Sequence, residues 1–148
     1  MIDRVIMRVS EVMVRDPVTF HPDTPVNEIA KTMRERSISS VVLVKEGKPV
    51  GVVTERDLVH RVLAEGKDPS KMRAWDICSK PVVAVSIYCD VDDAVDTMND
   101  YKIRRLVVVD PDDKVTGILT TDDLGFRLRN MSEELAMKYM ALNSRRGK

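Results

Sequence analysis

Two stretches, GVVTERD (residues 51–57) and GILTTDD (residues 117–123), share a glycine, an apolar strand end, a threonine, and an aspartate three residues later. They begin 66 positions apart in a chain of 148 residues. An apolar run that ends in Thr-x-x-Asp predicts a strand that passes directly into a helix. The threonine can cap the first turn and the aspartate at the third helical position can bond back to it. The chain therefore makes the same strand-to-helix corner twice.

Apolar runs surround both corners in the same order. The shorter runs, each near a Pro-Val pair, are VTF (18–20) and VVAV (82–85). The longer runs are VVLV (41–44) and LVVV (106–109), and their lack of alternation predicts strands buried on both faces. Turn-forming segments, KEGK (45–48) and DPDDK (110–114), connect these runs to the strands that contain GVVT and GILT. Each copy reads strand, helix, strand, strand, helix, with the last helix starting at about Asp57 or Asp123.

A helical stripe occupies the same place in both copies. Its apolar residues follow the i, i+3, i+4, i+7 spacing: Val26, Ile29, Ala30 and Met33, then Val91, Ala94, Val95 and Met98. Helix starts are predicted by Thr24 as the cap with Pro25 in the first helical position, and by Asp90 as the cap with Asp93 three residues on. We expect both methionines to pack in the core rather than form a partner-binding groove.

The repeat defines the organisation of the chain. Each copy has about 57 residues and leaves an apolar sheet face to cover, so two copies packed sheet to sheet would share one core. The polar segment EGKDPSK (65–71) is the connection. We predict a first domain at 8–64, a second at 72–130, and a C-terminal helix or tail at 131–148. Met131, Leu135, Met137 and Leu142 mark the apolar positions of that last segment.

Composition limits the classes of function. Lys+Arg and Asp+Glu balance at 24 each, so no overall field attracts nucleic acid or an anionic membrane. The first residues show no signal peptide, and no apolar run approaches the length of a membrane span. The two cysteines, Cys78 and Cys89, give no disulfide framework, and we expect reduced thiols in a cytoplasmic protein.

The doubled series of elements resembles the CBS domain, named after cystathionine β-synthase. The resemblance covers roughly residues 8 to 130 and resides in the ordered motifs of both copies, each ending in GxxTxxD. It implies a mixed α/β fold: tandem βαββα units with pseudo-twofold symmetry, their sheets packed together and their helices outside. It also implies two clefts that bind adenosyl ligands (AMP, ADP, ATP, S-adenosylmethionine or NAD), with no obligatory cofactor, and a homodimer formed through the CBS helices.

The aspartates of the two corners have two compatible interpretations. In one, Thr54 with Asp57, and Thr120 with Asp123, form capping boxes and nothing more. In the other, each carboxylate accepts both hydroxyls of a ribose, because one ionised carboxylate has acceptor capacity for two vicinal donors. The resemblance implies this ribose role for the aspartates and a position near the phosphate for the threonines.

By resemblance, each adenine slot is lined by apolar residues from both copies. The Asp57 cleft would be lined by Val52, Val82, Ile103 and Arg104. The Asp123 cleft would be lined by Val18, Ile38, Ser39 and Ile118. Plain core packing is the alternative for Val18, Val82, Ile38 and Ile103.

The two clefts should differ in charge. Copy two has Arg104 and Arg105 where copy one has two serines, and the planar guanidinium suits a phosphate. A solvated rim is the alternative role for these arginines. Before the ribose aspartate, copy one has Arg56 and copy two has Asp122, which would oppose a phosphate by about 1 kcal/mol in water. We therefore predict that the Asp57 cleft is the better nucleotide site, with Arg105 partly offsetting Asp122 in the other.

The sequence does not indicate any other class of functional site. The chain has no P-loop and no dinucleotide fingerprint, and it shows no nucleophile–base arrangement, so we do not expect an enzyme. His21 and His60 lack a metal-site spacing, and His60 could at most touch a bound phosphate. We predict a regulatory module that binds an adenosyl ligand and signals to an unidentified protein partner. The alternative is a structural dimerisation module with empty clefts; nucleic-acid binding is a minor variant that the neutral charge disfavours.

Overall fold

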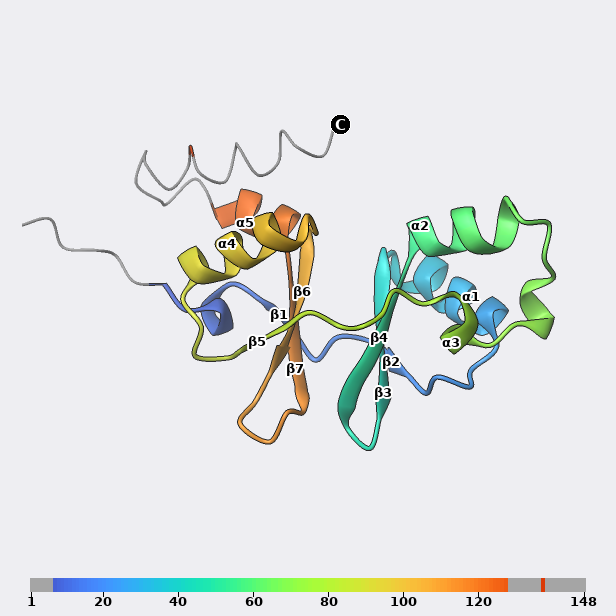
Figure 1. Ribbon diagram of the computed structural model, residues 1–148, viewed down its shortest axis with the longest axis horizontal. Coiled ribbons are helices and arrows are strands. Elements are labelled where there is room, and N and C mark those ends of the chain that lie inside the picture. Colours follow the sequence, from blue (N-terminus) through green and yellow to red (C-terminus); the bar gives the residue numbers. More distant parts are fainter. Residues whose placement is uncertain (1–6, 128–136, 138–148) are drawn as a thin grey trace, which may run out of the picture. The chain divides into compact units, whose positions relative to one another are not determined.

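The computed structural model describes residues 7–127 and Met137, with the side chains of residues 126 and 127 excluded (Figure 1). The chain divides into two compact units. Among residues 7–127, unit 1 comprises residues 7–16, 84–112 and 116–127, and unit 2 comprises residues 17–83 and 113–115. Each unit is a sheet with helices, so the mixed α/β class is confirmed. The predicted packing of one sheet on the other stays a prediction.

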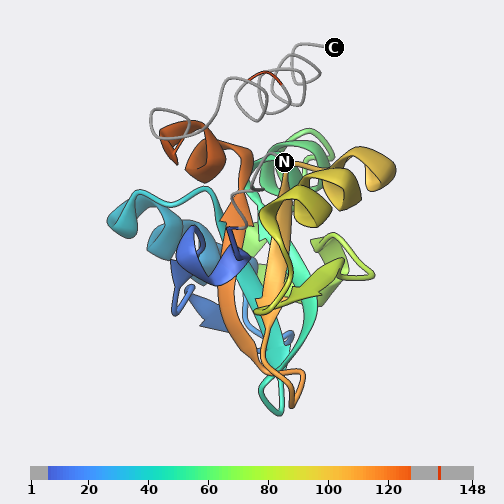
Figure 2. The ribbon, with the colours of Figure 1, turned by 90° about the vertical axis from the view of Figure 1, so that its left-hand side faces the viewer.

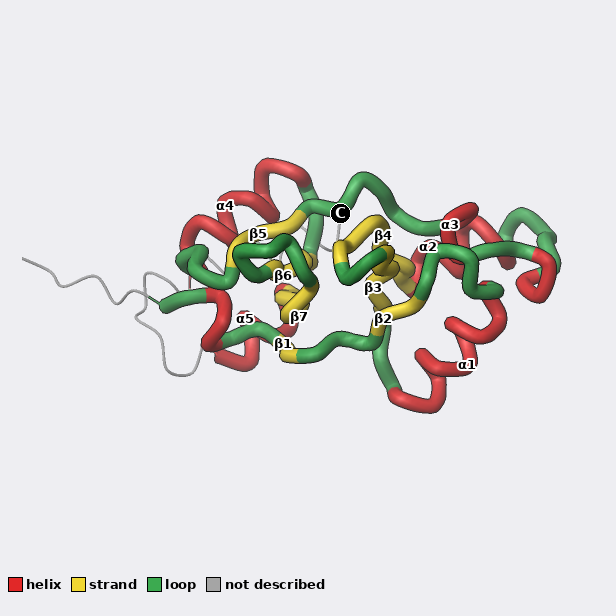
Figure 3. Tube along the Cα trace, turned by 90° about the horizontal axis from the view of Figure 1, so that it is seen from below, coloured by secondary structure: helices red, strands yellow, loops and turns green. Residues whose placement is uncertain are grey.

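Unit 2 is built on a three-stranded sheet in the order β2-β3-β4. The strands are β2 (Thr19–Phe20), β3 (Ser40–Lys45) and β4 (Lys48–Thr54), with β2 parallel and β4 antiparallel to β3. The helices are α1 (Val26–Arg36), α2 (Glu55–Leu58) with its π-helical continuation η2 (Val59–Leu63), the 3-10 turn η3 (Pro69–Lys71), and α3 (Ala74–Ile77). Figures 1 and 3 show α1, α2 and α3 on one face of this sheet.

Unit 1 is built on a four-stranded sheet in the order β1-β7-β6-β5. Its strands are β1 (Val14–Arg15), β5 (Ala84–Ser86), β6 (Arg105–Val109) and β7 (Val115–Thr120), with β1 antiparallel to β7 and β5 parallel to β6. Its helices are the 3-10 turn η1 (Val9–Glu11), α4 (Val91–Tyr101) and α5 (Thr121–Arg127). Figure 2 looks onto the helical face of this unit, where η1 and α4 lie in front of the strands.

The long apolar runs form the buried centre of each sheet. Val41, Val42 and Leu43 of β3 are at most 1% exposed, and so are Leu106, Val107 and Val108 of β6. The stripe residues of the helices are buried as predicted, including Met33 and Met98, with Ala30 only partly buried. The strands of the shorter runs lie later than predicted, since β2 begins at Thr19 and β5 at Ala84.

The observed ends of the helices differ in part from the prediction. Helix α1 begins at Val26, so Pro25 occupies the N-cap position and Thr24 does not cap; the bond from the Thr24 backbone N–H to the His21 carbonyl forms a turn instead. Asp90 is the N-cap of α4, but its side chain makes no capping bond. Both helices end in a left-handed residue, Ser37 or Lys102. The next amide, of Ile38 or Ile103, donates to the carbonyl of Met33 or Met98, which is the Schellman bond.

Each copy is preceded by a segment that packs in the other unit. Residues 7–16, before the first copy, pair with β7 and α4 in unit 1. Residues 72–80, before the second copy, lie in unit 2, where Ser79 pairs with Val52 through both backbone bonds. We call these the leading segments. In both, a sulfur side chain occupies the space beside a strand glycine: Cys78 against Gly51, and Met13 against Gly117.

Two further expectations can be compared only with the described residues. No helix among residues 7–127 is long and apolar enough to cross a membrane. The predicted helix or tail at 131–148 lies outside the described residues, apart from Met137.

Candidate functional site

The first corner is a complete capping box at the junction of β4 and α2. The Thr54 hydroxyl accepts from the Asp57 backbone N–H at 3.1 Å. In return, Asp57 Oδ2 accepts from the Thr54 backbone N–H at 2.9 Å and from the Thr54 hydroxyl at 3.1 Å. The helix therefore begins at Glu55, two residues before the position predicted from the sequence, because Thr54 is its N-cap. The carboxylate is held in one orientation at a helix start, where the helix dipole stabilises its charge.

The second corner repeats this geometry at the junction of β7 and α5. Asp123 Oδ2 accepts from the Thr120 backbone N–H at 3.0 Å and from its hydroxyl at 2.9 Å, and the Asp123 backbone N–H donates to that hydroxyl at 3.2 Å. Beside each corner, the loop before the central strand supplies a carbonyl to the first residue of the helix. Glu55 N–H donates to Ser39 O, and Thr121 N–H donates to Arg104 O.

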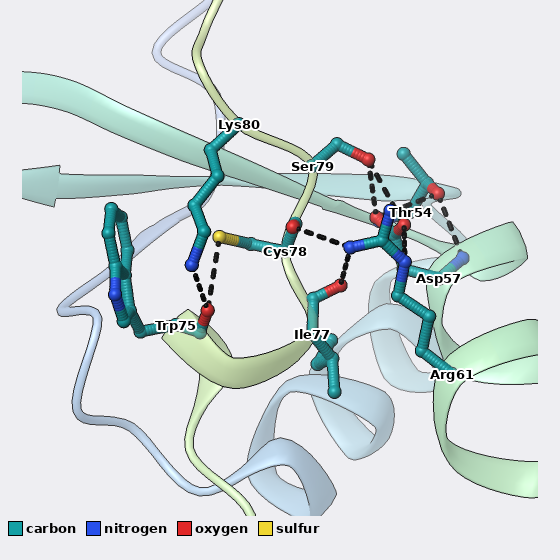
Figure 4. A network of polar contacts seen from close by, with 8 residues as sticks. All are labelled: Thr54, Asp57, Arg61, Trp75, Ile77, Cys78, Ser79 and Lys80. Atoms are coloured by element: carbon teal, nitrogen blue, oxygen red, sulfur yellow. Dashed lines mark hydrogen bonds and ion pairs between the residues drawn. The ribbon is translucent and has the colours of Figure 1, made fainter. Parts of the chain in front are cut away.

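The two carboxylates differ in what else they contact. The Ser79 hydroxyl lies 3.0 Å from Asp57 Oδ1 and 3.2 Å from Oδ2, and Arg61 Nε lies 3.7 Å from Oδ1 (Figure 4). Asp57 is consequently only 4% exposed. Asp123 is partly buried, and within residues 7–125 no donor is recorded on its Oδ1. Among the described residues, donors therefore engage both oxygens of Asp57 but only one oxygen of Asp123.

Arg61 joins the first carboxylate to the leading segment. Its Nη1 donates to the carbonyl of Cys78 at 3.0 Å and more weakly to that of Ile77 at 3.4 Å. These carbonyls belong to the last residue of α3 and to its C-cap, where a cation complements the helix dipole. Within the same segment, the Lys80 ammonium lies 3.7 Å from the centre of the Trp75 ring and donates to the Trp75 carbonyl at 2.8 Å.

The predicted lining residues are divided between the units. Unit 2 holds Val18, Ile38, Ser39, Val52, Thr54, Arg56, Asp57 and Val82; unit 1 holds Ile103, Arg104, Arg105, Ile118, Thr120 and Asp123. Each predicted cleft takes residues from both sets, so the assembly of a complete cleft stays a prediction. Within unit 2, Val18 and Ile38 pack against the core cluster, which supports at least a packing role for them.

The charged candidates beside the two aspartates differ in exposure. Arg56, Arg104 and Asp122 are exposed, and Arg105 is partly buried. His60 is exposed on η2, while His21 accepts a bond from the Asp23 backbone N–H at 3.1 Å, a local turn role. Across the described part of the chain, no group of three or more His, Cys, Asp or Glu side chains could hold a metal ion.

Both thiols are free and neither is positioned as a nucleophile. Cys78 is 1% exposed and Cys89 is partly buried. Burial raises the pKa of the Cys78 thiol, and burial together with the carboxylates of Asp93 and Asp90 raises that of Cys89. A raised pKa keeps a thiol protonated at neutral pH, and the protonated form is the unreactive one.

Sequence reasoning missed Ser79 and Arg61. A signal for Ser79 was present, because the leading segments MRVSEVMVR (7–15) and MRAWDICSK (72–80) repeat at a spacing of 65. Aligning them places Ser79 opposite Val14, and the structure pairs Ser79 with Val52 and Val14 with Ile118. Arg61 is four residues after Asp57, the spacing of a helical ion pair.

With this geometry established, comparison with known proteins identifies the family. The family model described as "CBS domain" matches residues 9–64 and again residues 74–128. The chain belongs to the CBS domain family. Among curated relatives, an uncharacterized protein of Methanopyrus kandleri is 46% identical over 117 residues, covering 78% of this chain and 60% of that protein. The chain therefore spans about three fifths of the length of that relative.

Solved CBS domain structures share the fold along most of the chain. The CBS domain protein PAE2072 from Pyrobaculum aerophilum, complexed with AMP, has a TM-score of 0.76 and 26% identity, covering 91% of this chain and 99% of that one. The CBS domain pair of protein MJ0100, in complex with 5′-methylthioadenosine and S-adenosyl-L-methionine, has a TM-score of 0.72 and 29% identity, covering 80% of this chain and 93% of that one.

Proposed function

We propose that this tandem CBS domain protein is a regulatory module that binds an adenosyl ligand and passes its presence to a protein partner. The observation that carries the proposal is the doubled corner, in which a carboxylate is fixed by Thr54 or Thr120 at a helix start. A ribose presents two vicinal donors to such a carboxylate. The AMP and S-adenosylmethionine complexes of CBS neighbours support this class of ligand.

In this proposal the ribose bonds to Asp57 or Asp123, and the adenine lies among the apolar residues predicted from each copy. Arg56 favours phosphate-bearing ligands such as AMP, ADP or ATP at the Asp57 cleft, while Asp122 disfavours them at the other. A ligand that contacts both copies shifts their arrangement only by its differential affinity for the two arrangements, which is how the signal would arise.

A binding panel tests the proposal. Isothermal titration with AMP, ATP, S-adenosylmethionine and NAD is made on the wild type, Asp57→Asn and Asp123→Asn, which remove a charge while keeping an acceptor for the cap. We expect Asp57→Asn to abolish phosphate-ligand binding and Asp123→Asn to leave most of it. Asp93→Asn, on the exposed face of α4, is the matched control. If no adenosyl compound binds, the structural module with empty clefts becomes the better account.

Self-association through the helices is the second part of the proposal. Val59 and Leu63, one turn apart on η2, are 50% and 75% exposed, and apolar surface of this kind favours burial against another chain. Leu63→Glu should lower the molar mass measured by light scattering from dimer to monomer. Leu63→Met, which keeps the apolar surface, should not.

A further inference from the structure

Asp57 accepts a bond from the Ser79 hydroxyl, and the described part of the chain places no matching donor on Asp123. A carboxylate oxygen has two main acceptor positions. Asp57 Oδ2 is used by the backbone N–H and the hydroxyl of Thr54, so Oδ1 is the oxygen left to receive further donors. The Ser79 hydroxyl lies closest to that oxygen, at 3.0 Å. Ser79 takes one of the two acceptor positions of Oδ1, and Arg61 Nε lies 3.7 Å from the same oxygen. A ribose, which presents two vicinal hydroxyls, needs both positions and therefore has to displace the Ser79 hydroxyl.

Ser79 can leave this position without disturbing the backbone. Its N–H donates to Val52 O at 2.8 Å and its carbonyl accepts from Val52 N–H at 3.1 Å, so the main chain is fixed to β4. The residue itself is exposed, whereas Asp57 is 4% exposed. Figure 4 shows the Ser79 hydroxyl directed at the Asp57 carboxylate. Rotation about the Ser79 Cα–Cβ bond would therefore move the hydroxyl away and open the carboxylate.

The second copy lacks this arrangement. At the matching place in the first leading segment, Val14 pairs with Ile118 as Ser79 pairs with Val52, and valine has no donor for Asp123. Equivalent corners thus differ in one hydroxyl group, which comes from outside the GxxTxxD motif.

We propose that Ser79 is an internal competitor for the ribose of an adenosyl ligand at Asp57, and that it sets the affinity of this site alone. The inference rests on the proposed function. A ligand must replace the Ser79–Asp57 hydrogen bond with its own, so its apparent affinity is reduced by the strength of that bond. Arg61 contacts both Asp57 and the carbonyl of Cys78, so the carboxylate for which Ser79 and the ligand compete is linked to the C-terminal end of α3.

The test measures AMP binding by titration in the Asp123→Asn background, where only the Asp57 site is scored. Ser79→Ala should bind AMP about 3- to 10-fold more tightly, because the ligand no longer has to replace a hydrogen bond, which at this exposed serine we take at the ordinary net strength. Ser79→Thr restores the hydroxyl and should return the wild-type affinity. Ser86→Ala, an exposed serine of β5, is the matched control and should change nothing.

The outcomes separate the two proposals. Binding of AMP that depends on Asp57 but is equal or weaker in Ser79→Ala overturns the competitor role and leaves the proposed function standing. Binding detected only in Ser79→Ala supports the competitor role strongly. Absence of binding in every variant, Ser79→Ala included, removes the proposed function for AMP and the competitor role together.

Discussion

The contact between Gly51 and Cys78 gives a quantitative test of how the second leading segment is held. A Cβ added at Gly51 would lie 2.8 Å from Cys78 Sγ and 3.3 Å from Cys78 Cβ. Cys78 is 1% exposed, so its sulfur has little room to move. Overpacking a tight contact costs about 1–3 kcal/mol, while alanine in place of a strand glycine returns about 0.5–1 kcal/mol of backbone entropy. We expect Gly51→Ala to lower the free energy of unfolding by about 1–2 kcal/mol.

A double-mutant cycle isolates the contact. Cys78→Ala alone should cost about 1 kcal/mol for the lost buried sulfur. In the double variant the new Cβ occupies space that the sulfur has left, so the combined cost should fall short of the sum by about 1–2 kcal/mol. The assay is urea unfolding followed by the fluorescence of Trp75, the single tryptophan, which lies in α3 beside the contact. Effects that add within about 0.5 kcal/mol would show that Gly51 and Cys78 do not pack as described.

Three other predictions concern the caps, the core and the thiols. Thr54→Val should lower the free energy of unfolding by about 1–2 kcal/mol, and Thr120→Val by about 0.5–1 kcal/mol, both measured by urea unfolding. The first cost is larger because it leaves the buried carboxylate of Asp57 with fewer donors. Equal losses in the two variants would contradict this. Leu106→Ala, at 1% exposure, should lower the free energy of unfolding by about 2–5 kcal/mol, whereas Tyr88→Ala, at 60% exposure and outside the helices, should change it by no more than about 0.5 kcal/mol in thermal unfolding. Alkylation of both thiols should be slow at pH 7 and rise steeply above pH about 9, since burial raises their pKa values; a fast reaction of Cys78 at pH 7 would refute its burial.

The sequence predicted the parts of this fold that depend on local pattern. The runs at 41–44 and 106–109 lack alternation and form the buried strands β3 and β6. Thr-x-x-Asp is a local signal, and both capping boxes form as expected. Thr24 misled the prediction because the helix begins one residue later than the cap signal indicates, at Val26 with Pro25 as N-cap, and Thr24 uses its backbone N–H in a turn to His21.

The features that the sequence did not predict depend on contacts between residues distant in the chain. Ser79 follows the Asp57 corner by 22 residues, and no periodicity connects them. Its role requires knowing that residues 72–80 return to pair with β4. The charge comparison of Arg56 with Asp122 was available from sequence, but the number of donors already on each carboxylate was not. A motif identifies the acceptor, and the tertiary structure determines how much of it is free.

The assignment of each leading segment to the other copy's unit has a consequence for how such a protein can be divided or assembled. If one copy were made alone with the segment that precedes it, that segment would lack the sheet of the other copy on which it packs. The sheet of the copy itself would also lack the leading segment that normally packs on it. Two such chains could satisfy each other by exchanging segments, as in a domain-swapped dimer. Joining the copies in one polypeptide turns this into an intramolecular event with a high effective concentration. Fragments cut at the repeat boundary should therefore complement each other in trans, whereas residues 17–83 carry their own partner segment.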